Sequence, residues 1–370
     1  MTLFDGITAR IIETPRLSVN VLERAGDDPA APPERTVVLV HGNVSSALLW
    51  QETMQDLPSD LRVIAVDLRG FGGTEHAPID ASRGVRDFSD DLHETLEAMG
   101  IAAAHLVGWS MGGGVIMQYA LDHPVLSLTL QAPVSPYGFG GTRRDGSRLT
   151  EDDAGCGGGG ANPDFVQRLI DRDTTAEAPT SPRSVFRSGY VAAGYETEHE
   201  DVWVESMLTT STATGNYPGD AVASENWPGF AAGTIGVLNT MTPAHFDVSS
   251  IVELTDKPPI LWIHGTLDPI VSDASFYDLN NLGKLGIVPG WPGDDVAPAQ
   301  PMVSQTRDVL GRYAAAGGQV TEVELEGVGH SPHLERPIEF RRALLGVIGH
   351  SGEPANPAPS TEAIIMRSSD

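Results

Sequence analysis

The amino-acid sequence predicts an α/β fold with a mostly parallel central sheet flanked by helices, and two observations support the prediction. Short apolar runs, of which Thr36–Val40 and Arg62–Val66 are the clearest, alternate with longer segments of helical periodicity. Runs that are apolar throughout are typical of parallel strands buried on both faces. The helical segments supply the crossovers that such strands require. A chain of 370 residues has room for one such domain and an insertion.

The first half of the chain divides cleanly into strands and helices. The predicted strands are Ile7–Ile12 and Ser18–Glu23, which form a hairpin, then Thr36–Val40, Arg62–Val66, His105–Gly108 and Ser127–Gln131. The predicted helices are Ala47–Leu57, Val85–Met99 and Met111–His123. Pro58 stops the first helix and Gly100 closes the second, as these residue types commonly do.

The second half begins with an interruption. From Val134 to Thr242 the alternation gives way to Gly and Pro clusters, and it then resumes. The later elements are the strands Ile260–Ile263 and Val320–Leu325 and the helices Val303–Ala316 and Pro337–Ile348. We therefore expect a core of residues 1–133 and 247–350 with a cap domain of residues 134–246 inserted. A second irregular stretch, Ser275–Met302, has the length of functional loops, but its role stays open.

The C-terminal tail, residues 351–370, is rich in Pro, Ala and Ser, and this composition predicts disorder. Its apolar run Ala363–Met366 could still dock on a partner.

Composition narrows the classes of partner. The formal net charge is −27, and nucleic acids and anionic membranes would repel such a surface. Cys156 is the only cysteine, so no intramolecular disulfide can form. Residues 1–6 lack a secretory pattern and no apolar run is long enough to span a membrane, so we expect a cytoplasmic protein. The oligomeric state stays open.

Residues 108–112 read Gly-Trp-Ser-Met-Gly between a predicted strand and a predicted helix. Gly-x-Ser-x-Gly in this context is a nucleophile elbow, a tight turn that lifts the serine hydroxyl clear of the sheet. The small residues Gly108 and Gly112 allow the neighbouring strand and helix to approach closely. The sequence therefore predicts Ser110 as a catalytic nucleophile, with the Met111 backbone N–H aimed at a developing oxyanion.

A serine nucleophile needs a general base, and a histidine base needs a carboxylate to orient it. His330 and Asp268 both follow predicted strands, at the edge of the sheet where functional groups gather. His333 is a weaker alternative to His330, and we expect it to face solvent or to support the site from outside the triad. Asp67, which also follows a predicted strand, is a weaker alternative to Asp268. The predicted catalytic triad is thus Ser110, Asp268 and His330.

The chain resembles the α/β-hydrolases over roughly Val19–Leu130 and Pro259–Ile348. Four motifs carry the resemblance in order: His41-Gly42-Asn43, the elbow, residues 264–269 (His-Gly-Thr-Leu-Asp-Pro) and Gly329-His330. It implies that the backbone N–H of Asn43 joins that of Met111 in the oxyanion hole, and that His41 shapes this loop. The loop after His41 is similar to that of haloalkane dehalogenases, which attack with an aspartate. A serine in the elbow fits acyl transfer to water instead.

The insertion is rich in aromatic residues, which favours an apolar or aromatic substrate. As pocket residues we name Trp109, which could equally lie in the core, and the candidates Trp203, Trp227 and Phe246. The expected function is hydrolysis of an apolar carboxylic ester or lactone. The alternatives are amide hydrolysis, C–C bond hydrolysis, a cofactor-free perhydrolase and, from another class, a hydrolase-like ligand receptor. No metal-ligand spacing and no nucleotide-binding glycine motif occurs, so we expect no metal and no cofactor.

Overall fold

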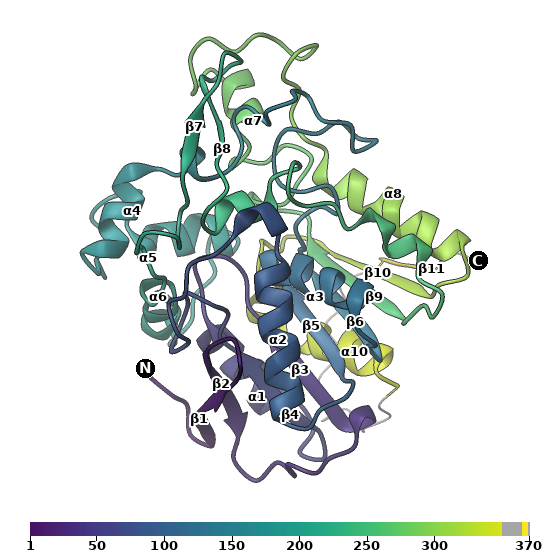
Figure 1. The fold of residues 1–370 in the computed structure, drawn as a ribbon. Coiled ribbons are helices and arrows are strands. Elements are labelled where there is room, and N and C mark those ends of the chain that lie inside the picture. The colour runs from purple at the N-terminus through teal and green to yellow at the C-terminus, as the bar shows by residue number, and fades with distance from the viewer. Residues whose placement is uncertain (350–364, 369–370) are drawn as a thin grey trace.

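A nine-stranded sheet forms the centre of the protein in a computed structural model, which describes residues 1–349 and 365–368 (Figure 1). The spatial order of the strands is β1-β2-β4-β3-β5-β6-β9-β10-β11. The six strands from β4 to β10 in this order run parallel, while β1, β2 and β11 run antiparallel to their neighbours. The strands are β1 (Ile7–Glu13), β2 (Ser18–Arg24), β3 (Thr36–Val40), β4 (Arg62–Val66), β5 (His105–Trp109), β6 (Ser127–Gln131), β9 (Ile260–Gly265), β10 (Val320–Leu325) and β11 (Ile365–Ser368).

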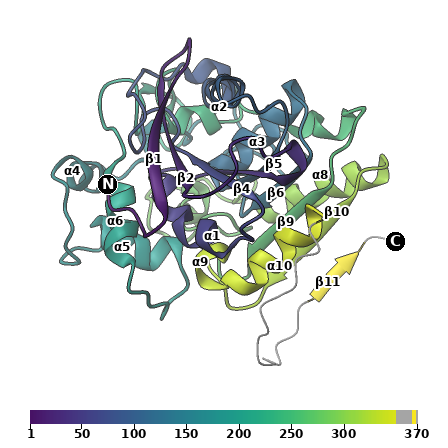
Figure 2. The same ribbon diagram turned by 90° about the horizontal axis from the view of Figure 1, so that it is seen from below.

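Helices cover both faces of this sheet. Figure 2 shows α2, α3 and α8 on one face and α1, α9 and α10 on the other. The bounds are α1 (Gln51–Asp56), α2 (Arg86–Ala98), α3 (Met111–Asp122), α8 (Met302–Ala315), α9 (Pro332–Glu335) and α10 (Pro337–Val347). Every residue of β3, β4, β5, β6 and β9 is buried, as expected of parallel strands covered on both sides.

The chain leaves the sheet after β6 and returns to it at the neighbouring strand β9, so residues 132–259 lie outside the sheet. The predicted cap, residues 134–246, falls within this segment and is called the insertion below. Figure 1 shows its elements at the top and along the left side of the molecule. They are α4 (Pro163–Ile170), α5 (Pro182–Val185), a π-helical turn over Phe186–Tyr190, α6 (Glu200–Leu208) and the hairpin β7 (Ala221–Ala223) with β8 (Phe230–Ala232). Because β6 and β9 are adjacent, the insertion does not alter the order of the core strands.

The Ser275–Met302 stretch contains α7 (Leu279–Lys284), whose first turn is capped by the Asp278 carboxylate. The indole of Trp227, from the insertion, donates to the carbonyl of Pro289 at 2.9 Å. This stretch therefore packs on the insertion.

Two parts of the structure differ from the sequence prediction. The predicted helix Ala47–Leu57 begins as a 3-10 turn, Ala47–Trp50, before α1. In the tail, Ile365–Ser368 forms β11, so the expected disorder is wrong for these residues, while 351–364 and 369–370 lie outside the described part of the chain. The strand supplies partners for the outer edge of β10, where backbone groups would otherwise be left unpaired. Within the described residues, no helix has the length and apolar character needed to cross a bilayer.

Candidate active site

Ser110 lies between β5 and α3 with φ 57° and ψ −119°, a backbone conformation that non-glycine residues rarely adopt. The packing around the turn requires glycine on both sides of it. A Cβ on Gly108 would lie 2.3 Å from the carbonyl oxygen of Gly112, and one on Gly112 would lie 2.4 Å from that of His41. Ser110 itself is half-buried. These close approaches hold the strained turn that presents the serine side chain, as the motif predicts.

Asp268 and His330 meet beyond the carboxyl ends of β9 and β10, which pair in parallel register. His330 Nδ1 lies 2.7 Å from Asp268 Oδ2. The other carboxylate oxygen, Oδ1, accepts from the backbone N–H groups of Ile270 and Val271 at 2.8 and 3.0 Å. Asp268 is 5% exposed and His330 is 1% exposed. A buried carboxylate fixed in this way orients the imidazole so that Nε2 is free to act as a base.

The elbow and the histidine loop are joined through Trp109. Its indole Nε1 donates to the carbonyl of His330 at 2.8 Å, and the two rings lie 5.4 Å apart. Because Trp109 directly precedes Ser110, this bond places the loop of the predicted base beside the predicted nucleophile. No hydrogen bond joins the Ser110 hydroxyl to the imidazole within the described chain. In unliganded enzymes such bonds are often long and tighten only when substrate is bound.

The expected oxyanion loop lies against Ser110. A Cβ on Gly42 would come within 2.9 Å of the Ser110 Cβ, so the backbone leading into Asn43 borders the nucleophile. Met111 is the first residue of α3, where N–H groups have no partner within the helix. Both predicted oxyanion donors are therefore backbone groups of segments that flank Ser110.

His41 supports this loop from within. Its Nε2 accepts from the backbone N–H of Leu68 at 2.9 Å, and Nδ1 lies 2.7 Å from the carbonyl oxygen of Gly42. An accepting Nε2 places the proton on Nδ1, which donates to Gly42. Burial lowers the pKa of His41 to about 4, so the ring stays neutral. The expected shaping role fits this geometry.

The two alternative triad residues have structural partners. The ring of His333 is buried, so it does not face solvent; Nδ1 lies 2.7 Å from Gln131 Nε2, and the ring packs 4.4 Å from that of Trp50. Asp67 accepts from the backbone N–H groups of Ala47 and Gly73. Neither side chain is hydrogen-bonded to the other predicted triad members in the described structure.

The four aromatic residues named for the substrate pocket all pack against other parts of the protein, and their contact with substrate stays a prediction. Trp109 lies in the core beneath the elbow, 1% exposed. Trp203 is fully buried 5.8 Å from the ring of Phe4, and Phe246 borders Gly114 of α3. Trp227 contacts the Ser275–Met302 stretch, as described above. Large aromatic side chains gain most from burial, and a composition argument cannot separate that role from substrate contact.

Sequence reasoning missed two residues that border the site. Tyr190, in the π-helical turn, donates through its hydroxyl to the carbonyls of Asn43 and Val44 at 3.0 and 2.9 Å. Its ring stands edge-on to Trp109 at 5.3 Å, and burial raises its pKa. Glu335, in α9, accepts from backbone groups of the histidine loop. No periodicity or motif considered at the sequence level singles out either residue.

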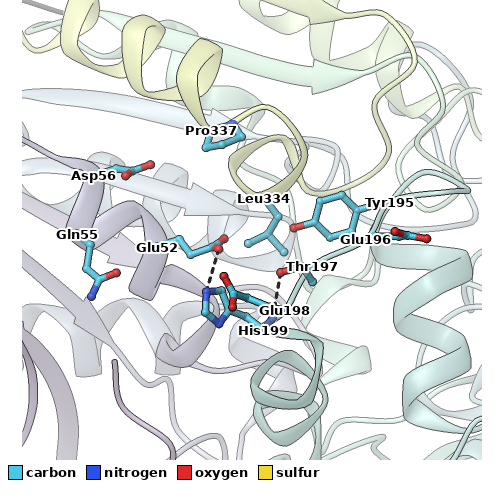
Figure 3. A pocket seen from close by; sticks show the side chains of 10 residues that line it. All are labelled: Glu52, Gln55, Asp56, Tyr195, Glu196, Thr197, Glu198, His199, Leu334 and Pro337. Atoms are coloured by element: carbon cyan, nitrogen blue, oxygen red, sulfur yellow. Dashed lines mark hydrogen bonds and ion pairs between the residues drawn. The ribbon is translucent and has the colours of Figure 1, made fainter. Parts of the chain in front are cut away.

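A cavity of about 510 Å³ lies apart from the predicted triad, between α1, residues 195–199 and the start of α10 (Figure 3). It is lined by Glu52, Gln55, Asp56, Tyr195, Glu196, Thr197, Glu198, His199, Leu334 and Pro337. Its lining is mostly polar and acidic, and Glu52 faces His199 at 3.6 Å. These features do not match the apolar pocket that the sequence predicts, and no nucleophile of the elbow type lines it.

Among the residues that the structure describes, one cluster has ligand atoms close enough for a metal ion: His264, Glu322 and Glu324, within 4.8 Å of one another. Arg307 forms ion pairs with both glutamates and so already supplies the positive charge there. Its guanidinium also lies over the ring of Trp262.

Comparison with known proteins agrees with this fold. The family model described as Alpha/beta hydrolase family matches residues 37–343. A fluoroacetate dehalogenase from a Burkholderia species is 30% identical over 140 residues, which cover 36% of this chain and 44% of that relative. The chain thus aligns with less than half the length of this curated relative.

Two solved structures share the fold at low sequence identity. An esterase from Exiguobacterium antarcticum superposes with a TM-score of 0.55 at 17% identity, covering 92% of this chain and 100% of its own. A 2-hydroxy-6-oxo-6-phenylhexa-2,4-dienoate hydrolase from Rhodococcus sp. strain RHA1 gives a TM-score of 0.53 at 17% identity, covering 93% and 99%. With a family model that spans most of its length, a parallel sheet and an elbow after β5, the chain belongs to the α/β-hydrolase family.

Proposed function

We propose that this α/β-hydrolase cleaves carboxylic esters through a serine-bound acyl intermediate. The observation that carries the proposal is the 2.7 Å contact between Asp268 and His330, tied through Trp109 to the elbow that presents Ser110. A hydroxyl, an imidazole and a buried carboxylate in this relation form the triad that activates a serine.

The mechanism follows from these positions. His330 removes the Ser110 proton as the serine oxygen attacks the carbonyl carbon, and the Met111 and Asn43 amides stabilise the oxyanion. His330 then protonates the departing alkoxide, and the acyl group stays on Ser110. Water, deprotonated by the same histidine, attacks the acyl carbon and releases the acid. Asp268 stabilises the imidazolium in both halves of the reaction.

The identity of the nucleophile separates this activity from dehalogenation. An aspartate that displaces a halide forms an ester, which water can cleave at its acyl carbon. A serine that displaces a halide would form an ether with no carbonyl to attack. Similarity to a fluoroacetate dehalogenase therefore does not extend to its chemistry, because the elbow carries Ser110.

The substrate class that we propose is an apolar or aromatic ester or lactone, admitted under a cap formed by residues 134–246. The hydroxyl of Tyr190 supports the position of the cap, since it links the insertion to the oxyanion loop, and the aromatic content of the insertion supports an apolar substrate. We further propose a reduced, cytoplasmic setting, in line with a single cysteine that is buried.

A fluorophosphonate probe and a panel of p-nitrophenyl esters, lactones and amides test the proposal together. Ser110→Ala should fold normally, lose probe labelling and lose ester turnover by at least about 10⁴-fold, because the remaining groups have no nucleophile to activate. Circular dichroism of the variant controls for folding. Turnover near the wild-type rate would remove Ser110 from the mechanism, and labelling of wild type without turnover of any ester would favour the ligand-receptor alternative.

A further inference from the structure

Glu335 is a buried carboxylate, 8% exposed, with no cationic side chain bonded to it in the described structure. Removing a carboxylate from water is costly unless hydrogen-bond donors surround it. Because Glu335 lies five residues after the predicted base, its hydrogen-bond partners show how the loop that carries His330 is held.

The partners of Glu335 lie on both sides of His330. Oε1 and Oε2 accept from the Gly329 N–H at 3.0 and 2.9 Å, and Oε1 accepts from the Ser331 N–H at 3.3 Å. The residues before and after the predicted base are therefore held by one side chain. Asp268 fixes the imidazole ring, while Glu335 fixes the backbone that carries it.

A third N–H, which makes the fourth hydrogen bond, comes from the insertion. Ala192, two residues after Tyr190, donates to Glu335 Oε2 at 2.8 Å. The fit is close, because a Cβ on Gly329 would lie 2.6 Å from the Ala192 nitrogen. The insertion thus contacts the oxyanion loop through Tyr190 and the histidine loop through Glu335.

We propose that Glu335 is a positioning residue for the general base. Its charge acts on His330, and its bond to Ala192 holds the cap against the loop that carries His330. This inference rests on the proposed function, because it assigns His330 the role of base. Burial raises the pKa of Glu335, while the backbone donors and His330 oppose that shift.

An effect of the Glu335 charge on His330 would distinguish a positioning role from simple packing. The titratable groups around His330 are Asp268 beyond β9, His333 and Glu335 in α9, and Tyr190 in the insertion. Burial lowers the pKa of His333 to about 3 and raises that of Tyr190, which leaves Asp268 and Glu335 as the carboxylates beside the imidazole. Replacing Glu335 by a neutral residue removes its electrostatic attraction to the charged form of His330.

The test measures the rate at which a fluorophosphonate labels Ser110, and the hydrolysis of p-nitrophenyl butyrate, from pH 5 to 9. Glu335→Gln should slow labelling and lower kcat by about 10- to 100-fold with KM within about twofold, because the base is misplaced. In Glu335→Gln, the acidic limb of the pH profile should move to lower pH both for labelling and for hydrolysis. Glu335→Asp keeps the charge, so its acidic limb should stay at the wild-type position although its rate falls.

Asp27→Asn is the matched control. Asp27 also accepts a backbone N–H, from Val63 at 2.8 Å, but it lies near the start of β4, at the opposite end of the parallel strands. The Asp27→Asn variant should leave the labelling rate, kcat and both pH profiles unchanged. The proposal would be overturned by a folded Glu335→Gln variant that keeps the wild-type labelling rate or the wild-type acidic limb of the pH profile. It would also be overturned if the acidic limb moved equally in Glu335→Asp or in Asp27→Asn. If Glu335→Gln does not fold, a wild-type rate in Glu335→Asp overturns it.

Labelling needs an activated Ser110 but no ester. Wild-type protein that labels yet cleaves no ester would refute the proposed substrate class, while the labelling rates would still decide the role of Glu335.

Discussion

The positions of Ser110, Asp268 and His330 could be predicted from sequence because each follows a strand of a parallel sheet, and such strands end at one edge. Their partners could not be predicted in the same way. Glu335 and Tyr190 act through backbone groups of loops, whose paths depend on tertiary packing rather than on a pattern of residue types. The pocket aromatics stay predictions for a related reason: a buried tryptophan such as Trp203 and a substrate-contacting tryptophan are alike in sequence.

Asp268→Asn tests the acid of the triad. The amide cannot hold the tautomer in which Nδ1 is protonated and Nε2 is free, so kcat should fall by about 10³- to 10⁴-fold while the fold persists. Steady-state kinetics on a p-nitrophenyl ester measure the loss, and thermal unfolding controls for stability. A fall of less than about tenfold would reassign the acid, with Asp67→Asn as the next variant to examine.

His333 should make stability depend on pH. Burial lowers its pKa to about 3, whereas an unfolded histidine titrates near 6.5. Below pH 6.5 the unfolded chain binds a proton that the folded chain does not, so acidification destabilises the fold across this window. His333→Gln removes that contribution, and the gap between wild type and variant in the free energy of unfolding should narrow from pH 7 to pH 4. Urea denaturation at each pH measures the gap; a constant gap would contradict a buried neutral ring.

At the scale of elements, prediction succeeded where one pattern determines the structure. The bounds of β3, β4, β6 and β10 were predicted to the residue. The first three are runs of five buried residues, which have few alternatives, whereas β10 alternates between apolar and polar residues and is only partly buried. The insertion was predicted only as an interruption, since its short helices and its hairpin lack a sustained period. Helix α9 was missed because four residues after a proline carry too little periodicity to recognise.

Gly112→Ala tests the packing of α3 on β3. The added methyl would meet the carbonyl oxygens of His41 and Val40 at 2.4 and 2.5 Å, and backbone cannot move aside cheaply. We expect a loss of about 1–3 kcal/mol in the free energy of unfolding, together with reduced ester turnover as the elbow shifts. Urea denaturation and kinetics measure the two effects.

Gly346→Ala is the matched helical control, because a Cβ there meets nothing within 4 Å. Alanine in an open position of α10 should stabilise the protein by about 0.5–1 kcal/mol and leave turnover unchanged. Equal effects of the two substitutions would mean that the contact between α3 and β3 is looser than the structure indicates.

At the scale of the whole molecule, 50 acidic residues face only 23 basic ones. Some of the charge is neutralised locally, as where Arg16 and Arg69 pair with Asp91. The excess remains on the surface, where like charges repel in the compact state more than in the unfolded chain.

Screening should therefore stabilise this protein. Raising NaCl from 0.05 to 1 M shortens the Debye length to about 3 Å and should raise the midpoint of thermal unfolding by a few degrees. Differential scanning calorimetry measures the shift, and KCl should give the same result if screening is the cause. A midpoint that falls with salt would show that the ion pairs outweigh the repulsion.

Because β6 and β9 are adjacent, the insertion could be exchanged for the corresponding segment of a homologue without changing the order of the core strands. Two bonds limit how freely this can be done. A donor segment would have to bring its own phenol to Asn43 and its own amide to Glu335, or the chimaera would retain the triad while losing the alignment of its loops. Changes of specificity are thus better sought in the β7–β8 hairpin and α7 than by replacing residues 134–246 as a block.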